Sequence, residues 1–179
     1  MTGPDDADPT DDPGPDGSPA PAPDGSRRVR GALGRLVRKG QAEIPESEDP
    51  QLLLWQLEQF TDRVVRRNGA DSVEAARARM ELSLQLAKLG KWHEAQLLRE
   101  DGFATLSRHR GEDDPETLQT EVSLAVALAH TGRGTEAEAH LEHAASAGLD
   151  ALGPDHEVTG LARRRLDEFR QGRADPPAG

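Results

Sequence analysis

Five glycines divide most of this chain into segments of equal length. Gly69, Gly90, Gly111, Gly132 and Gly153 follow one another every 21 residues, and about 18 residues with helical periodicity lie between successive glycines. Glycine often ends a helix because it adopts a left-handed backbone at little cost. The spacing therefore predicts a row of equal antiparallel helices, in which a pair of helices repeats over every two glycine intervals.

Residues that favour helix starts follow most of these glycines. Pro115 occupies a first helical position, where its missing N–H is no loss. Two pairs have the spacing of a capping box, in which a side chain at each position caps the other's backbone. The predicted N-caps are Asp71, Asp114, Thr135 and Asp155, and the predicted capping boxes are Asp71 with Glu74 and Thr135 with Glu138.

The apolar residues of each segment lie on one helical face, so each helix needs neighbours to bury that face. We therefore predict an all-α fold, an antiparallel helix-pair solenoid. Helix 50–67 aligns with helix 92–109 after a shift of one full repeat, and is thus the second helix of a pair whose first helix is missing. The expected helices span residues 50–67, 72–89, 92–109, 115–131, 135–152 and 156–171.

Composition divides the chain into four parts. Residues 1–26 hold seven acidic and no basic residues and almost nothing to bury, which predicts a disordered tail. Residues 27–47 form a basic linker that begins with a possible amphipathic helix, either semi-ordered or in contact with an anionic surface such as lipid. Residues 48–171 form the helical domain, and residues 172–179 form a second disordered tail.

Net charge excludes several classes of function. The chain carries a formal charge of −11, and residues 112–153 hold nine acidic residues against one basic residue, Arg133. Nucleic-acid binding needs basic surface, so we expect no nucleic-acid partner. There is no cysteine, no basic and apolar leader and no run of 18 apolar residues, so we expect a cytoplasmic protein without stable membrane insertion.

The repeat resembles a known family at its turns. Residues 86–95 read LAKLGKWHEA, residues 111–118 read GEDDPETL and residues 152–156 read LGPDH. They are similar to the tetratricopeptide repeat (TPR), in the longer 42-residue form of kinesin light chain and of many bacterial regulators, over about residues 69–171. Ala95 and Ala137 match the small residue at the close helix approach, and Trp92 matches the aromatic over the turn. Gly134 replaces that aromatic in the second pair, which predicts a looser turn, and Arg99 departs from an apolar preference.

This resemblance implies a non-catalytic scaffold or adaptor that binds a protein or peptide on its concave face. The alternative is a regulatory or sensor component that acts on a transcription factor, a kinase or a nucleotide-switch protein. The lysine and asparagine pattern that holds a C-terminal carboxylate in chaperone-binding relatives is absent. The residues expected on the concave face are Arg77, Met80, Leu84, Lys88, Gln119, Val122, Val126, His130, Leu161 and Arg164.

Two patterns suggest other chemistry. Residues 132–137, GRGTEA, match a phosphate-binding fingerprint, but a helix rather than a strand is expected before them. His140 and His143 with Glu136 could bind zinc from one helix face, or could simply form a solvated face. No local context brings a nucleophile and a base together. We therefore expect no enzyme activity, no cofactor and no metal.

Helix 50–67 carries more apolar residues than one neighbouring helix should cover, which predicts an association site. Either the basic segment 27–40 folds back over it, using Val29, Leu33, Leu36 and Val37, or a second copy or a partner covers it. A monomer or a weak homodimer through this helix is therefore expected. The apolar residues concerned are Leu52, Leu53, Leu54, Trp55, Leu57 and Phe60.

Overall fold

The computed structural model describes residues 44–174, and the structural statements below refer to that part of the chain. Its regular elements are all α-helices, which confirms the predicted fold class. They are α2 (Pro50–Asn68), α3 (Val73–Lys88), α4 (Trp92–Arg110), α5 (Pro115–His130), α6 (Gly134–Leu152) and α7 (Glu157–Ala174). The expected helices are thus found within about three residues at each end.

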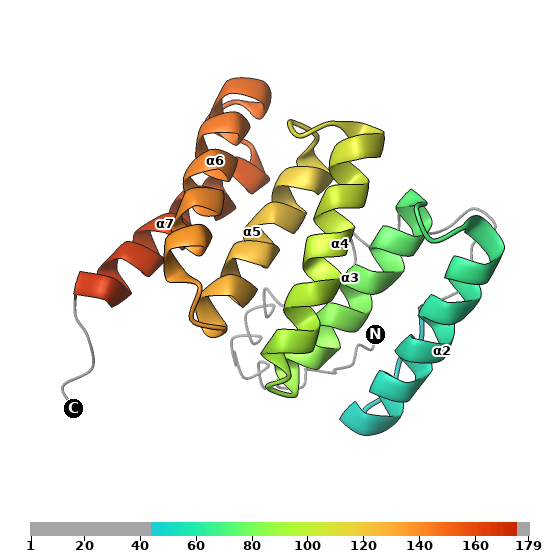
Figure 1. Ribbon diagram of the computed structural model, residues 1–179. Coiled ribbons are helices and arrows are strands. Elements are labelled where there is room, and N and C mark those ends of the chain that lie inside the picture. Colours follow the sequence, from blue (N-terminus) through green and yellow to red (C-terminus); the bar gives the residue numbers. More distant parts are fainter. Residues whose placement is uncertain (1–43, 175–179) are drawn as a thin grey trace, which may run out of the picture. The chain divides into compact units, whose positions relative to one another are not determined.

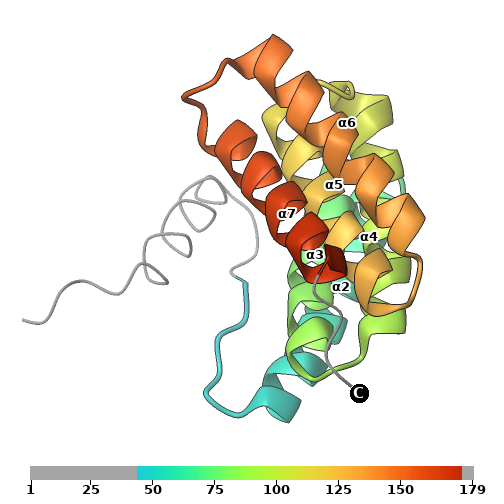
Figure 2. The same ribbon diagram turned by 90° about the vertical axis from the view of Figure 1, so that its left-hand side faces the viewer.

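The helices form two series with the same repeat. One series begins at Pro50, Trp92 and Gly134, and the other begins at Val73, Pro115 and Glu157, with the same interval between successive starts in both. Each helix packs against the next along the chain (Figure 1), and α5 also contacts α7 directly. The helices α3, α5 and α7 lie on one side of the repeats and α4 and α6 on the other (Figure 2). We call α3, α5 and α7 the inner series.

The five spaced glycines end their helices as expected. Their φ angles lie between 76° and 93°, in the region that favours glycine. A Cβ built on any of the five would meet nothing within 4 Å. Backbone conformation, rather than lack of space, therefore requires glycine at these positions.

Three of the four predicted N-caps are wrong. Asp114 accepts a hydrogen bond from the Glu116 backbone N–H at 2.9 Å, as predicted. The N-cap of α3 is Ser72, not Asp71, because the Ser72 hydroxyl accepts from the Ala75 N–H at 3.1 Å. The predicted capping box of Asp71 with Glu74 is therefore wrong, and so is that of Thr135 with Glu138, because Thr135 lies inside α6.

The other two errors have the same cause, a start shifted by one or two residues. Thr135 lies inside α6, whose N-cap Arg133 makes no side-chain cap bond. Before α7, the Nδ1 of His156 accepts from the Val158 N–H at 3.2 Å, so the ring replaces the expected Asp155 carboxylate.

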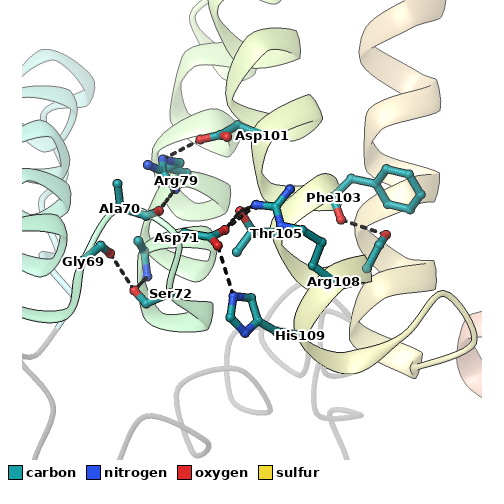
Figure 3. Close-up of polar contacts among 12 residues, drawn as sticks. Gly69, Ala70, Asp71, Ser72, Arg79, Asp101, Phe103, Thr105, Arg108 and His109 are labelled. Atoms are coloured by element: carbon teal, nitrogen blue, oxygen red, sulfur yellow. Dashed lines mark hydrogen bonds and ion pairs between the residues drawn. The ribbon is translucent and has the colours of Figure 1, made fainter.

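Asp71 instead joins the turn before α3 to helix α4. It pairs with Arg108, and its Oδ2 lies 3.5 Å from Nε2 of His109 (Figure 3). Nearby, Arg79 Nε lies 3.0 Å from Asp101 Oδ2. The hydrogen bond from Arg108 is the main cause of a lowered Asp71 pKa. These pairs join both the turn before α3 and the middle of α3 to α4.

The turns before α4 and α6 share a backbone hydrogen bond, and the turn before α4 has a further one, from Trp92 N to Gly90 O at 2.9 Å. In the first turn, Lys91 N donates to Leu86 O at 2.9 Å, and in the second Arg133 N donates to Leu128 O at 2.8 Å. Gly134 stands where the family has an aromatic residue, and the Phe169 ring of α7 lies 3.5 Å from a Cβ built on it. The two turns thus have this hydrogen bond in common, and Phe169 of α7 packs on the second turn in place of the missing aromatic residue.

The core consists of two apolar clusters, one at each end of the repeats. Ala95 and Ala137 are completely buried, as their predicted role at the close approaches requires. The first cluster joins α2, α3 and α4 through Leu54, Leu57, Leu82, Leu86 and Ala95. The second joins α5, α6 and α7 and includes Leu118, Val122, Leu128, Leu141, Ala144 and Ala162.

Helix α2 buries more of its apolar side chains than expected. Leu54, Leu57 and Phe60 are buried, whereas Leu52 and Trp55 remain 46% and 57% exposed. The predicted association surface therefore shrinks to the face that holds these last two residues. Segment 27–40, one of its predicted covers, lies outside the described residues.

Candidate functional site

All the residues predicted to bind a partner lie on helices of the inner series. On α3, the side chains at 77, 81, 84 and 88 follow helical spacing along one face. Leu84 is 39% exposed, one of the few large apolar side chains in the described chain that reach solvent. Lys88 beside it and Arg164 on α7 are also exposed. We call the surface formed by Leu84, Lys88, Gln119, Val126, Leu161 and Arg164 the inner surface.

Three predicted residues already have other roles. Val122 is 2% exposed and packs in the core, so it cannot contact a partner. Arg77 donates from Nε and Nη2 to both carboxylate oxygens of Glu116, at 2.6 and 2.7 Å. His130 is exposed but stacks on Trp92, with ring centroids 3.6 Å apart and planes 6° from parallel. Arg77 and His130 thus join neighbouring helices.

Met80 lies next to the inner surface, on its core side. A Cβ built on Gly102 of α4 would lie 3.4 Å from the Met80 sulfur. The small residue on α4 therefore makes room for the Met80 side chain. Met80 is only half-buried, so it remains at the boundary between core and surface.

Glu81 is an acidic residue on the same face of α3, and the sequence analysis did not single it out. Burial raises the pKa of its carboxyl group, and the charge of Lys88 opposes that rise. Spacing alone could have identified it, because position 81 lies between the predicted positions 77 and 84. This face therefore mixes both signs of charge.

Arg99 is the least expected buried residue. It lies on α4 with only 3% of its surface exposed. Its Nε donates to Ser83 Oγ on α3 at 3.2 Å, and its Nη1 donates to the Ser123 carbonyl on α5 at 2.8 Å. Burial lowers the pKa of Arg99 to about 10. The side chain thus extends from α4 to both neighbouring helices of the inner series.

His140 and His143 lie near each other, and both contact a buried carboxylate that the sequence analysis did not single out. Glu121 of α5 has a side chain only 3% exposed, and its carboxylate accepts hydrogen bonds from both rings. The Nδ1 atoms of His140 and His143 lie 2.9 and 3.0 Å from Glu121 Oε1. Glu136, the third predicted zinc ligand, instead pairs with Arg133. The two rings therefore hold a buried carboxylate while remaining partly exposed to solvent themselves.

The pKa of His143 is raised, mainly by the hydrogen bond to Glu121. Within residues 44–174, no group of three or more His, Asp or Glu side chains is arranged to hold a metal ion. No helix of that region is both long and apolar enough to cross a membrane.

Comparison with solved structures identifies the architecture. The chain superposes on the crystal structure of TPR-like repeats of a Podosopora anserina kinesin light chain with a TM-score of 0.65. The match covers 83% of this chain and 67% of that chain, at 21% sequence identity.

The fold is a TPR-like helical repeat. No family of known sequences matches the chain, and neither does any curated protein. The likeness at this identity concerns the fold alone. The functional conclusion therefore depends on the residues of this chain.

Proposed function

We propose that this protein is a non-catalytic adaptor of the TPR type, which binds an extended or helical peptide of a partner protein on its inner surface. The observation that supports this most directly is the exposed Leu84 beside Lys88 on α3. An apolar side chain next to a cation suits a peptide that offers an apolar residue and some negative charge. We place this activity in the cytoplasm.

The experiment compares the same substitution at two exposed leucines of the full chain. Leu84→Glu puts a carboxylate on the inner surface, and Leu97→Glu does the same on α4, where Leu97 is 56% exposed. We expect wild type and Leu97→Glu to recover the same partner from an extract of the native cell, whereas Leu84→Glu loses it. Equal recovery by both variants would contradict the proposal.

A further inference from the structure

The guanidinium of Arg99 is a buried cation without a balancing anion. An arginine side chain has five N–H donors, and two of them are used on Ser83 and Ser123. No carboxylate of residues 44–174 forms an ion pair with Arg99, and burial is the cause of its lowered pKa. Three donors are thus left without an acceptor in the described chain, and because Nη2 is not among the fully buried side-chain atoms that lack a partner there, it keeps some contact with solvent.

Buried charges in proteins are normally paired, because removing an ion from water is costly. At the equivalent position of the next repeat the chain has Leu141, which is 2% exposed and packs in the core. An apolar residue therefore fits this place in the repeat. Packing alone does not explain why the first pair has arginine here.

The guanidinium lies next to the inner surface. Ser123, whose carbonyl accepts from Nη1, is only partly buried and has a short side chain. It lies on α5 between Gln119 and Val126, both of which belong to the inner surface. A peptide group placed over Ser123 would therefore come close to the unused donors.

We propose that Arg99 binds a carboxylate of the peptide held on the inner surface, and so selects partners with an acidic group at that point. This inference rests on the proposed function. The planar fork of a guanidinium matches the two oxygens of a carboxylate. One carboxylate also balances the single charge, whereas a phosphate dianion would need a second cation, and Arg77 is already paired with Glu116.

The test selects ligands for the full-length protein from a library of random 12-residue peptides displayed on phage. We expect the selected peptides to share one aspartate or glutamate at a fixed distance from an apolar residue. Replacing that acid by its amide should weaken binding to wild type on the order of tenfold. The same replacement should change binding to Arg99→Met less than twofold, because the carboxylate has lost its partner.

The controls separate this inference from the proposed function. Peptides that bind Leu84→Glu as well as wild type would contradict the proposed function. Peptides that depend on Leu84 but lose the same affinity for wild type and Arg99→Met on amide replacement would overturn the inference alone. Selection of no peptide, or of peptides without a shared acid, would also overturn it.

Stability gives an independent measurement. If Arg99 is an unbalanced buried charge, Arg99→Met should melt at the same temperature as wild type or higher. A purely structural role predicts a lower melting temperature and unchanged peptide preference. Should Arg99→Met fail to fold, Arg99→Lys keeps the charge without the fork and should lose most of the preference for the acid.

Discussion

Individual residues set how closely the helices approach. Gly148 on α6 is such a residue, because a Cβ built on it would lie 3.1 Å from Thr159 Oγ1 and 3.5 Å from Thr159 Cα. The Thr159 hydroxyl also donates to the Gly148 carbonyl at 2.8 Å. Gly160 on α7 is also helical but exposed, and a Cβ there would meet nothing within 4 Å.

This difference predicts opposite effects of the same substitution. Gly148→Ala should lower the free energy of unfolding by about 1–3 kcal/mol, because the new methyl group overpacks the contact between α6 and α7. Gly160→Ala should raise it by up to about 1 kcal/mol, since alanine is the better helix former. Urea titration of both variants measures the effects. Equal stabilities would show that α6 and α7 do not approach closely at Gly148.

The pair of Glu121 and His143 predicts a pH dependence. The pKa of His143 is raised above its ordinary value of 6.5, so the protonated ring is more stable in the folded state. Its contribution is therefore complete below about pH 6.5 and is lost as the pH rises through the higher folded pKa. Because the ring is partly exposed, we expect about 0.5–1 kcal/mol.

Urea titrations of the full chain between pH 5.5 and 8.5 measure this contribution. In His143→Gln, the fall in unfolding free energy over that range should be smaller than in wild type. His93→Gln is the matched control, because His93 is exposed on α4. A pH profile of His143→Gln that coincides with wild type would show that the Glu121 contact contributes no stability.

At the scale of helices, the two series differ in how their N-termini are capped. Helices of the inner series begin with a side chain that accepts a backbone N–H: Ser72, Asp114 and His156, at equivalent positions of successive repeats. The following helices, α4 and α6, have Lys91 and Arg133 at their N-cap positions, and neither side chain makes such a bond. There, Lys91 and Arg133 pair instead with glutamates in the first turn, Glu94 and Glu136.

The cap of α3 can be tested directly. Ser72→Ala should lower the free energy of unfolding by about 1 kcal/mol, because the Ala75 N–H loses its acceptor. Asp71→Ala removes exposed ion pairs with Arg108 and His109 and a long hydrogen bond from Thr105, so its effect should be the smaller one. Thermal melts of the two variants compare them. A larger loss in Asp71→Ala would mean that Asp71 is the true cap.

The contact between α4 and α5 is more polar than the two apolar clusters on either side of it. Besides Arg99, Gln96 is 3% exposed, and its Oε1 accepts from the Thr131 hydroxyl at 2.5 Å. Trp92 and His130 stack at the end of the same contact. Polar contacts of this kind require particular geometry, so they fix how the first helix pair meets the second.

At the scale of the whole molecule, α2 begins the repeats with one side uncovered by any described helix. It packs against α3, and its exposed face holds Leu52 and Trp55. We expect weak, concentration-dependent dimerisation through this face. Sedimentation equilibrium of the full chain should then show a molar mass that rises with concentration.

A matched pair of variants assigns the contact. Trp55→Glu should return the mass to that of a monomer. Leu97→Glu should not, although Leu97 lies at the equivalent position of the next repeat and is equally exposed. A wild-type mass that stays monomeric at every concentration would rule out the dimer.

Much of this architecture follows from the sequence because its signals are local. A glycine with positive φ, a proline at a first helical position and an apolar face each depend on a few neighbouring residues. The five glycines therefore placed the helices and the repeat. The repeat period also contained a signal that we did not use, since a shift of one repeat back from Asp114 identifies Ser72 as the cap of α3.

Only the tertiary structure decided how side chains pair across helices. Arg99 meets Ser83 and Ser123, and Glu121 meets His140 and His143, over separations of 16 to 24 residues. Such contacts depend on the rotation and spacing of packed helices, which a periodic pattern does not specify. For the same reason, the candidate partner-binding residues could be assigned to helices from the sequence, but the burial of Val122 and the exposure of Leu84 could not be predicted.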